Sequence, residues 1–319
     1  MTRFDRRTLL GALVAAPTLL ARPVRSEEAP REFRIGYQKN GILVVAKQRR
    51  AIEERLRPQG VEMRWIEFSF GPPLLEALNV GSVDFGTTGD APPIFAQAAG
   101  ANLVYVAQAP NGGSSSAILV HADAPIRTLA ELKGRRVAFA KGSSAHNLTV
   151  AALEKAGLTY RDVQPLHLAP ADAAAAFSRG SVDAWTIWDP YFAIAERGGQ
   201  TRVLAYGRDI APQNSFYLGN RTFTERHPRL VRAVVDALAE VAAWSQANRG
   251  EVATLLAEGT GVDPEAMRRA VERTEFVIEA GVSEAVAAEQ QRVADRFHAL
   301  GLIPRQVRVR EALWTPPAA

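Results

Sequence analysis

The segment 179–191, Arg-Gly-Ser-Val-Asp-Ala-Trp-Thr-Ile-Trp-Asp-Pro-Tyr, constrains the fold of this chain more than any other stretch. Gly180 suits the left-handed position at which a helix ends. Residues 184–188 are apolar, aromatic and β-branched, which is typical of a strand that is buried on both faces. The Asp-Pro pair that follows favours the start of a helix, with the aspartate as N-cap and the proline at the first helical position. Trp188 and Asp189 are therefore predicted at the carboxyl end of a parallel strand, where ligands bind in open α/β sheets.

A second segment repeats this plan. Gly-Ser-Val-Asp occurs at 81–84 and again at 180–183, in both cases between a helical pattern and a strand pattern. Each strand then leads into an aspartate followed closely by proline, at Asp90 and at Asp189. We interpret the repeat as two α/β halves of like design. The alternative is a coincidence between two copies of a common helix-to-strand turn.

Residues 1–26 resemble an export signal. Arg6 and Arg7 belong to a basic start, and residues 8–21 form an apolar stretch that is too short to span a bilayer as a helix. The arginine pair resembles a twin-arginine signal, with general secretion as the alternative. Small residues stand three and one positions before Glu27, so cleavage is predicted there and the mature protein is predicted in the periplasm; an uncleaved anchor is the alternative.

Composition excludes several classes of function. The first 26 residues carry five arginines and one aspartate, which equals the net charge of +4 of the whole chain, so the mature chain is close to neutral. The basic balance therefore does not indicate nucleic-acid binding, and no basic stripe with interleaved aromatics occurs. The chain has no cysteine, and its five histidines show no metal-ligand spacing. We therefore expect no disulfide, metal or cofactor.

Strand and helix patterns alternate along the rest of the chain, as in α/β proteins. The polar, glycine-rich segment 111–116 predicts a first crossing between two lobes, and a strand pattern at 214–219 predicts the return. The predicted strands are 33–37, 62–68, 85–88, 103–107, 117–121, 136–140, 163–168 and 184–188. The predicted helices are 42–57, 72–80, 92–99, 129–134, 144–156, 171–179, 190–197, 222–248, 264–277 and 283–300.

These elements predict two doubly wound α/β lobes joined by a two-crossing hinge, with a cleft between them. Lobe 1 is predicted to comprise residues 33–115 and 217–319, and lobe 2 residues 116–216. The helices after residue 222 are expected to pack across lobe 1.

Two segments resemble the aliphatic sulfonate-binding proteins of bacterial ABC importers. They are Asp-Ala-Pro-Pro-Ile-Phe at 90–95 and Asp-Ala-Trp-Thr-Ile-Trp-Asp-Pro at 183–190. Weaker matches are Gly-Pro-Pro-Leu-Leu-Glu at 71–76, Leu-Lys-Gly at 132–134 and Lys-Gly-Ser-Ser-Ala-His-Asn at 141–147. The resemblance runs from about residue 34 to residue 302. It implies the type II periplasmic binding protein fold and a monomer that captures alkanesulfonates in the cleft. It also implies delivery to an ABC permease with its ATPase subunit.

The residues themselves suit such a ligand. A sulfonate is a permanently ionised anion whose oxygens only accept hydrogen bonds, so a good site supplies free N–H groups, as helix N-termini do. Three helix starts at strand ends offer them, near Gly71, near Gly89 and at 142–144. The predicted ligand-binding residues are Gln38, Gly89, Asp90, Ala91, Gly142, Ser143, Ser144, His146, Asn147, Trp188 and Asp189.

Each of these residues also has a purely structural interpretation. The serines and aspartates are ordinary helix caps, and His146 is a helix-surface residue in the alternative view. Trp185 and Trp188 alternate in facing, so only one of them faces the cleft, and Trp188 is the better candidate.

Catalysis is not expected. The sequence has no Gly-x-Ser-x-Gly elbow, no His-Glu-x-x-His helix and no phosphate loop. An enzymatic role is suggested only by analogy of fold, with proteins that make a thiamine pyrimidine precursor, and the export signal argues against it. Among binding functions, taurine, nitrate or another small oxyanion competes with an aliphatic sulfonate as the ligand. A tryptophan in the cleft favours an organic ligand over nitrate.

The export signal makes a testable prediction. N-terminal sequencing of the protein isolated from its native host is expected to read from about Glu27, because the residues before it have the composition of a cleaved signal. An isolated protein that still begins at Met1 would contradict this prediction.

Overall fold

The computed structural model describes residues 29–315. The predicted export signal and the cleavage site before Glu27 lie outside these residues. Among the described helices, none combines the length and the apolar character needed to cross a membrane.

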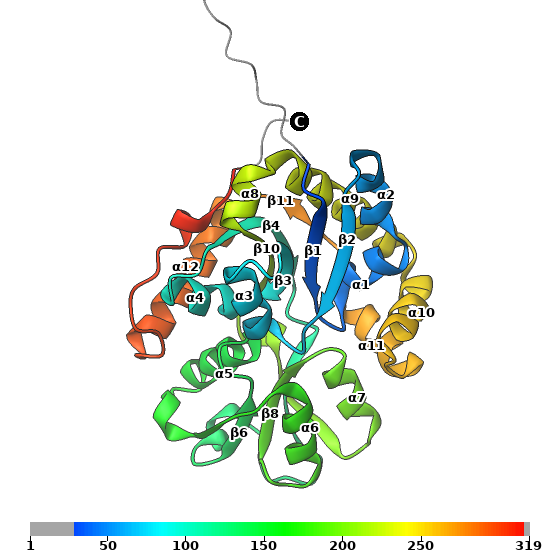
Figure 1. The fold of residues 1–319 in the computed structure, drawn as a ribbon. Coiled ribbons are helices and arrows are strands. Elements are labelled where there is room, and N and C mark those ends of the chain that lie inside the picture. Colours follow the sequence, from blue (N-terminus) through cyan, green and yellow to red (C-terminus); the bar gives the residue numbers. More distant parts are fainter. Residues whose placement is uncertain (1–28, 316–319) are drawn as a thin grey trace, which may run out of the picture.

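Two separate sheets organise the chain (Figure 1). The large sheet has the strand order β11-β4-β10-β3-β1-β2, and the small sheet has the order β7-β6-β8-β5-β9. In each sheet three strands are parallel, namely β2, β1 and β3 in the large one and β7, β6 and β8 in the small one. The strands are β1 (Glu32–Tyr37), β2 (Glu62–Glu67), β3 (Phe85–Gly89), β4 (Leu103–Asn111), β5 (Ser116–His121), β6 (Arg136–Phe139), β7 (Gln164–His167), β8 (Ala184–Trp188), β9 (Thr201–Tyr206), β10 (Gln213–Asn220) and β11 (Glu279–Ala280).

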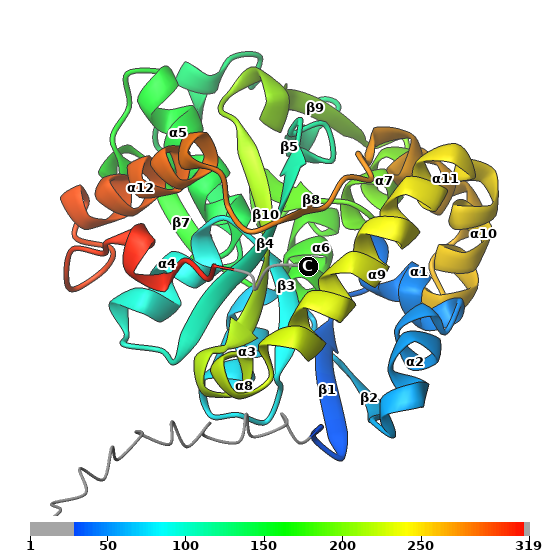
Figure 2. The same ribbon diagram turned by 90° about the horizontal axis from the view of Figure 1, so that it is seen from above.

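Helices cover both faces of the large sheet (Figures 1 and 2). One face packs on α1, α2, α9, α10 and α11, and the other on α3, α4 and α12. We call this body the large lobe, and the small sheet with α5, α6 and α7 the small lobe. The predicted fold of two α/β lobes is confirmed. The helices are α1 (Gly41–Gln48), α2 (Ala51–Leu56), α3 (Gly71–Asn79), α4 (Ala91–Ala98), α5 (Ser144–Lys155), α6 (Pro170–Ser178), α7 (Tyr191–Arg197), α8 (Arg221–Arg226), α9 (Pro228–Ala247), α10 (Arg249–Thr260), α11 (Pro264–Arg273) and α12 (Glu284–Ala299).

The chain crosses between the lobes twice, from β4 to β5 and from β9 back to β10. The two crossings lie side by side and are joined by hydrogen bonds. The Arg208 N–H donates to the Gly113 carbonyl at 3.1 Å. The Ser116 hydroxyl also donates to Gln213 Oε1 at 2.7 Å. A Cβ at Gly113 would lie 2.6 Å from the Arg208 nitrogen, so this close approach requires glycine.

The repeated Gly-Ser-Val-Asp segments place the same ion pair in both lobes. Asp84 accepts hydrogen bonds from the backbone and guanidinium of Arg34, at 2.9 Å from N and Nε and 2.6 Å from Nη2. Asp183 binds Arg136 in the same way, at 2.8, 3.1 and 2.8 Å. Each arginine lies in the first strand of a parallel group, and each aspartate directly precedes the neighbouring parallel strand. This equivalence supports the interpretation of two halves built on one plan.

Two predicted helices are each divided into two in the structure. The predicted helix 42–57 is two helices, because Leu43 and Ile52 stand half a turn apart on a straight helix and both are fully buried. The chain turns at Arg50, which has a φ of 55°. The predicted helix 222–248 is divided into α8 and α9, since Pro228 starts a new helix.

Strand β9 and helix α10 are absent from the predicted elements. Strand β9 is half-buried at every position and lacks the alternation that marks a strand in sequence. Helix α10 falls between two predicted helices. Finally, Pro190 is the N-cap of α7 rather than its first residue, and the peptide bond between Asp189 and Pro190 is cis.

The paired aspartates differ in exposure, which makes a prediction. The Asp84 side chain is 2% exposed and that of Asp183 is 26% exposed. Asp84→Asn is expected to lower the free energy of unfolding by about 2–3 kcal/mol, because buried hydrogen bonds to a charged group are lost. The matched Asp183→Asn is expected to cost about 1 kcal/mol, since water screens that pair. Urea denaturation of both variants checks the order, and equal losses would contradict it.

Candidate functional site

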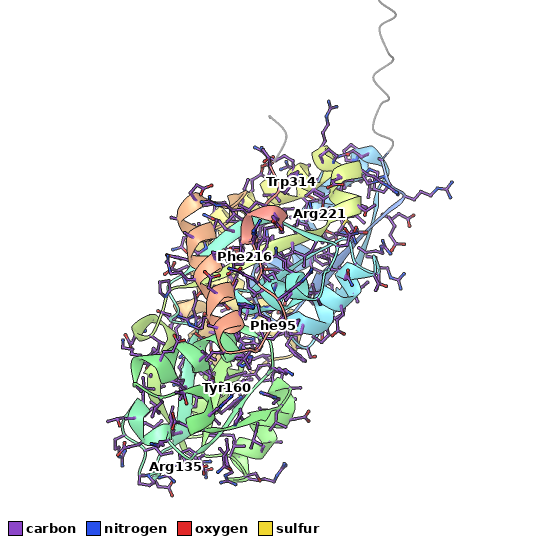
Figure 3. All side chains as sticks on the ribbon, turned by 90° about the vertical axis from the view of Figure 1, so that its left-hand side faces the viewer. Phe95, Arg135, Tyr160, Phe216, Arg221 and Trp314 are labelled. Carbon is purple, nitrogen blue, oxygen red and sulfur yellow. The ribbon has the colours of Figure 1, made fainter. Side chains whose placement is uncertain are left out.

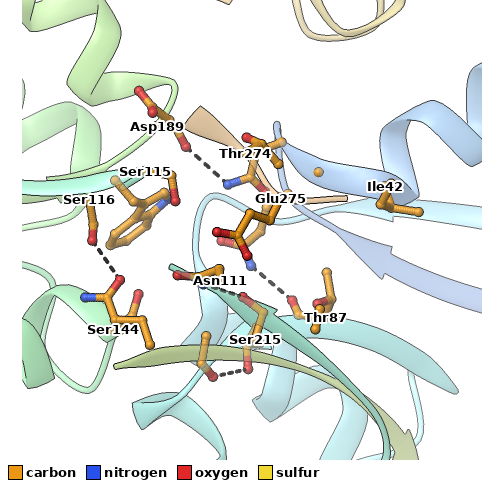
Figure 4. Close-up of a pocket in the computed structure, with 18 of the residues that line it drawn as sticks. Ile42, Thr87, Asn111, Ser115, Ser116, Ser144, Asp189, Ser215, Thr274 and Glu275 are labelled. Atoms are coloured by element: carbon orange, nitrogen blue, oxygen red, sulfur yellow. Dashed lines mark hydrogen bonds between the residues drawn. The ribbon is translucent and has the colours of Figure 1, made fainter. Parts of the chain in front are cut away.

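A cavity of about 180 Å³ lies between the two lobes (Figure 4). The carboxyl ends of parallel strands from both sheets meet there, as expected for ligand sites in α/β proteins. The large lobe contributes Gln38 after β1 and Gly89 at the end of β3, and the small lobe contributes Trp188 at the end of β8. Residues at the crossings, including Asn111 and Gln213, also line the cavity.

The structure divides the eleven predicted site residues into two groups. Six line the cavity, namely Gln38, Gly89, Ser143, Ser144, Trp188 and Asp189. The other five, Asp90, Ala91, Gly142, His146 and Asn147, are outside its lining.

Gly142 and Ser143 use their backbone N–H groups within their own loop. The Gly142 N–H donates to His146 Nδ1 at 3.1 Å, and the Ser143 N–H donates to the Ala140 carbonyl at 3.2 Å. The Ser143 hydroxyl also donates to Ala140, at 2.7 Å. The expectation that residues 142–144 all offer free N–H groups is therefore wrong for Gly142 and Ser143. Of these three residues only Ser144, at the first position of α5, has an N–H group without an acceptor among the described residues.

Asp90 and Asn147 connect the lobes instead of facing the cavity. Asp90 Oδ1 accepts the Ala91 N–H at 2.7 Å, and Asp90 Oδ2 accepts from Asn147 Nδ2 at 2.6 Å. Arg296 of α12 donates to Asn147 Oδ1 at 2.9 Å and to Glu154 at 2.8 Å. Burial raises the pKa of Asp90 to about 6, against the opposing hydrogen bonds from Asn147 and Ala91. This network links α4 and α12 of the large lobe to α5 of the small lobe.

His146 is fully buried in an aromatic cluster that spans both lobes, so it is not a surface residue. Its ring lies 4.8 Å from that of Phe139 in the small lobe and 5.0 Å from that of Phe297 in the large lobe. Phe95, Tyr160 and His167 also contact the His146 ring, and Figure 3 labels Phe95 and Tyr160. Burial lowers the pKa of His146 to about 3, so the ring is neutral.

Trp188 lines the cavity, whereas Trp185 is buried in the core of the small lobe. Asp189, next to Trp188, contacts the large lobe in two ways. Its carbonyl accepts from Asn40 Nδ2 at 3.2 Å, and its Oδ2 lies 3.3 Å from Arg273 Nε of α11. Burial raises the pKa of Asp189 to about 7, and the charge of Arg273 opposes this shift.

The N-terminus of α1 also lines the cavity, although none of its residues is among the predicted site residues. Asn40 is the N-cap of this helix, and Gly41 and Ile42 line the cavity with it. The Asn40 N–H donates to the Gln38 carbonyl at 2.7 Å, whereas the N–H groups of Gly41 and Ile42 have no acceptor among the described residues, as expected in a first helical turn. The signal is present in the sequence, because Asn-Gly directly precedes an apolar run, which is typical of a helix start. Thr87 is a further lining residue that the sequence did not predict.

Residues 58–251 match the model of the family described as NMT1/THI5 like. The chain is 45% identical over 92% of its length to an Escherichia coli (strain K12) protein that is named as an aliphatic sulfonates-binding protein, of which it covers 92%.

Two solved structures are similar as well. One is the periplasmic aliphatic sulphonate binding protein of Escherichia coli, with 44% identity, a TM-score of 0.83, and coverage of 91% of this chain and 94% of that chain. The other is the alkanesulfonate-binding protein of Xanthomonas axonopodis pv. citri bound to MOPS. It has 42% identity and a TM-score of 0.85, and the match covers 89% of this chain and 98% of that chain.

The approach of Gly89 to Ser144 across the cavity makes a prediction. A Cβ at Gly89 would lie 2.8 Å from the Ser144 Cβ, which belongs to the other lobe. Gly89→Ala is therefore expected to disfavour this arrangement of the lobes by about 1–3 kcal/mol. Small-angle X-ray scattering is expected to show a larger radius of gyration, with circular dichroism unchanged. Adding Ser144→Gly removes the clash and is expected to restore the wild-type radius; no restoration would contradict the explanation.

Proposed function

Since the chain belongs to the NMT1/THI5-like family and to the same family as the sulfonate-binding proteins of Escherichia coli and Xanthomonas, we propose that it captures aliphatic sulfonates between its lobes in the periplasm. The closed protein then delivers the sulfonate to the permease of an ABC importer. We further propose that this importer includes an ATPase subunit and that the protein acts as a monomer. Its export signal is proposed to be cleaved near Glu27. The protein acts by binding, without catalysis.

The observation that carries this proposal is a cavity with neutral hydrogen-bond donors at helix N-termini. Ser144 starts α5 on one side of the cavity, and Gly41 and Ile42 start α1 on the other. N–H groups at such positions suit an anion, and the helix dipole favours negative charge there. A sulfonate needs only donors from the protein, because it stays ionised at all physiological pH values and its oxygens only accept.

The remaining wall suits an organic tail. Helices α10 and α11, together with the segment after α11, contribute apolar side chains to the lining. Trp188 of the small lobe lies in the same lining. Burying a tail there gives a free-energy gain that increases with each methylene group, about 0.8 kcal/mol for each one fully buried. The apolar lining residues of this wall are Leu256, Met267, Ala270, Val271 and Phe276.

Closure of the lobes couples capture to delivery. Contacts between the lobes occur on both sides of the cavity, through Arg273 with Asp189 and Glu196, and through Arg296 with Asn147 and Glu154. A ligand held by both lobes stabilises this closed arrangement relative to an open one. We also propose that the two bodies correspond to residues 33–115 with 217–319 and to residues 116–216.

A thermal-shift panel tests the proposal. The ligands are methanesulfonate, octanesulfonate, taurine, sulfate and nitrate, each added to the purified protein in a sulfonate-free buffer. Because a ligand that binds only the folded state raises the apparent stability, alkanesulfonates are expected to raise Tm and nitrate is not. A rise with nitrate alone would replace the sulfonate assignment with an inorganic oxyanion.

Trp188→Ala provides a sharper prediction. The loss of the indole is expected to weaken octanesulfonate by about 1–3 kcal/mol and methanesulfonate by less than about 0.5 kcal/mol, since only a long tail contacts the ring. Trp188→Phe is the matched control and is expected to retain most of the affinity for octanesulfonate. Isothermal titration calorimetry measures the affinities of both ligands for both variants. Equal losses for the two ligands would show that Trp188 has a structural role only.

A further inference from the structure

The charges around the cavity are unusual for an anion site. The described residues that line it include two carboxylates, Asp189 and Glu275, and no lysine, arginine or histidine. A sulfonate that carries only its own negative charge therefore meets carboxylates in the lining and no cationic side chain there. Neutral N–H donors at the helix starts hold the sulfonate group, but they carry no formal positive charge that would offset a carboxylate.

The two carboxylates have different surroundings. Asp189 is buried, and its charge faces Arg273 at 3.3 Å. Glu275 follows α11 and remains exposed at the rim of the cavity. Among the described residues, its carboxylate has no ion-pair or hydrogen-bond partner. Glu275 therefore contributes an uncompensated negative charge.

The Glu275 side chain lies beside the first crossing and lines the cavity. A Cβ added at Gly112, in the first crossing, would lie 2.6 Å from Glu275 Oε1, so the carboxylate packs against the backbone of the hinge. Figure 4 draws Glu275 among the lining side chains, between Asp189 and Thr87 in that view. Its neighbours in the sequence, Thr274 and Phe276, line the cavity too.

We propose that the cavity selects zwitterionic sulfonates, in which Glu275 binds a cationic group at the far end of the tail. This inference rests on the sulfonate assignment made above. The anionic head binds the helix N–H groups of Ser144, Gly41 and Ile42, and the cation supplies the positive charge that the lining lacks. A zwitterion adds no net charge to the site, whereas a simple alkanesulfonate adds one negative charge beside Glu275.

A pair of ligands of equal shape tests this proposal. They are 3-(trimethylammonio)propane-1-sulfonate and its carbon isostere 4,4-dimethylpentane-1-sulfonate, which differ only in the charge of the tail. Calorimetry gives the affinity for the zwitterion divided by the affinity for the carbon isostere, for the wild type and for Glu275→Gln. The greater hydrophobicity of the carbon tail affects both proteins equally, so the change in this ratio measures the contribution of the carboxylate.

The ratio is expected to fall roughly two- to fivefold in Glu275→Gln, as for a solvent-exposed charge pair. The fall is expected to diminish at high salt, because screening weakens such pairs. Glu272→Gln is the matched control, since Glu272 lies outside the cavity lining and pairs with Arg268. Its ratio is expected to equal that of the wild type.

The outcomes separate this inference from the assignment on which it rests. If both ligands bind and Glu275→Gln leaves their ratio unchanged, the zwitterion proposal is wrong and the sulfonate assignment stands. If neither ligand nor any alkanesulfonate binds the wild type, the sulfonate assignment is wrong, and this proposal with it.

Discussion

The register of two neighbouring parallel strands in each lobe is the constraint on which the rest of the structure depends. Arg34 and Asp84 stand directly opposite each other at the start of β1 and β3, and Arg136 and Asp183 do the same at β6 and β8. A slip by one residue would separate each pair and turn every side chain to the other face of its sheet. With the register fixed at one end, Gln38, Gly89, Trp188 and Asp189 emerge together at the other. The cavity is thus positioned by ion pairs that lie far from it.

The closed arrangement is held on both sides of the cavity by arginines of the large lobe. Arg273 contacts Asp189, Glu196 and the ring of Phe192, and Arg296 contacts Asn147 and Glu154. Both arginines belong to C-terminal helices, so the last third of the chain adds to the contacts that Asn40, Gly89 and Asp90 make with the small lobe. Because Asp189 and Asp90 are buried close to these contacts, the junction of the lobes contains desolvated carboxylates as well as apolar contacts.

The sequence was sufficient for the fold and for the strand ends that meet at the cavity, because apolar runs, caps and repeated turns are local signals. It did not predict which hydrogen-bond partner each polar group has in the structure. Gly142 and Ser143 have the pattern of an anion-binding loop, yet His146 and Ala140 take their N–H groups. The bond between Asp90 and Asn147 joins two lobes and depends on their relative position, which no local pattern specifies. Edge strand β9 escaped prediction because it has no periodicity of burial.

The pair of crossings between the lobes has a mechanical consequence. A single connecting segment would leave two bodies free to rotate about three axes, but here two connecting segments are cross-linked by the hydrogen bonds of Gly113 with Arg208 and of Ser116 with Gln213. Such a ribbon bends easily about one axis only, across its own plane, and resists twisting and sideways shear. If the lobes close as proposed, two linked crossings therefore favour rotation about a single axis. The proposed closure on a ligand would then remove the entropy of one soft rotation instead of three, which would leave more of the contact energy for affinity.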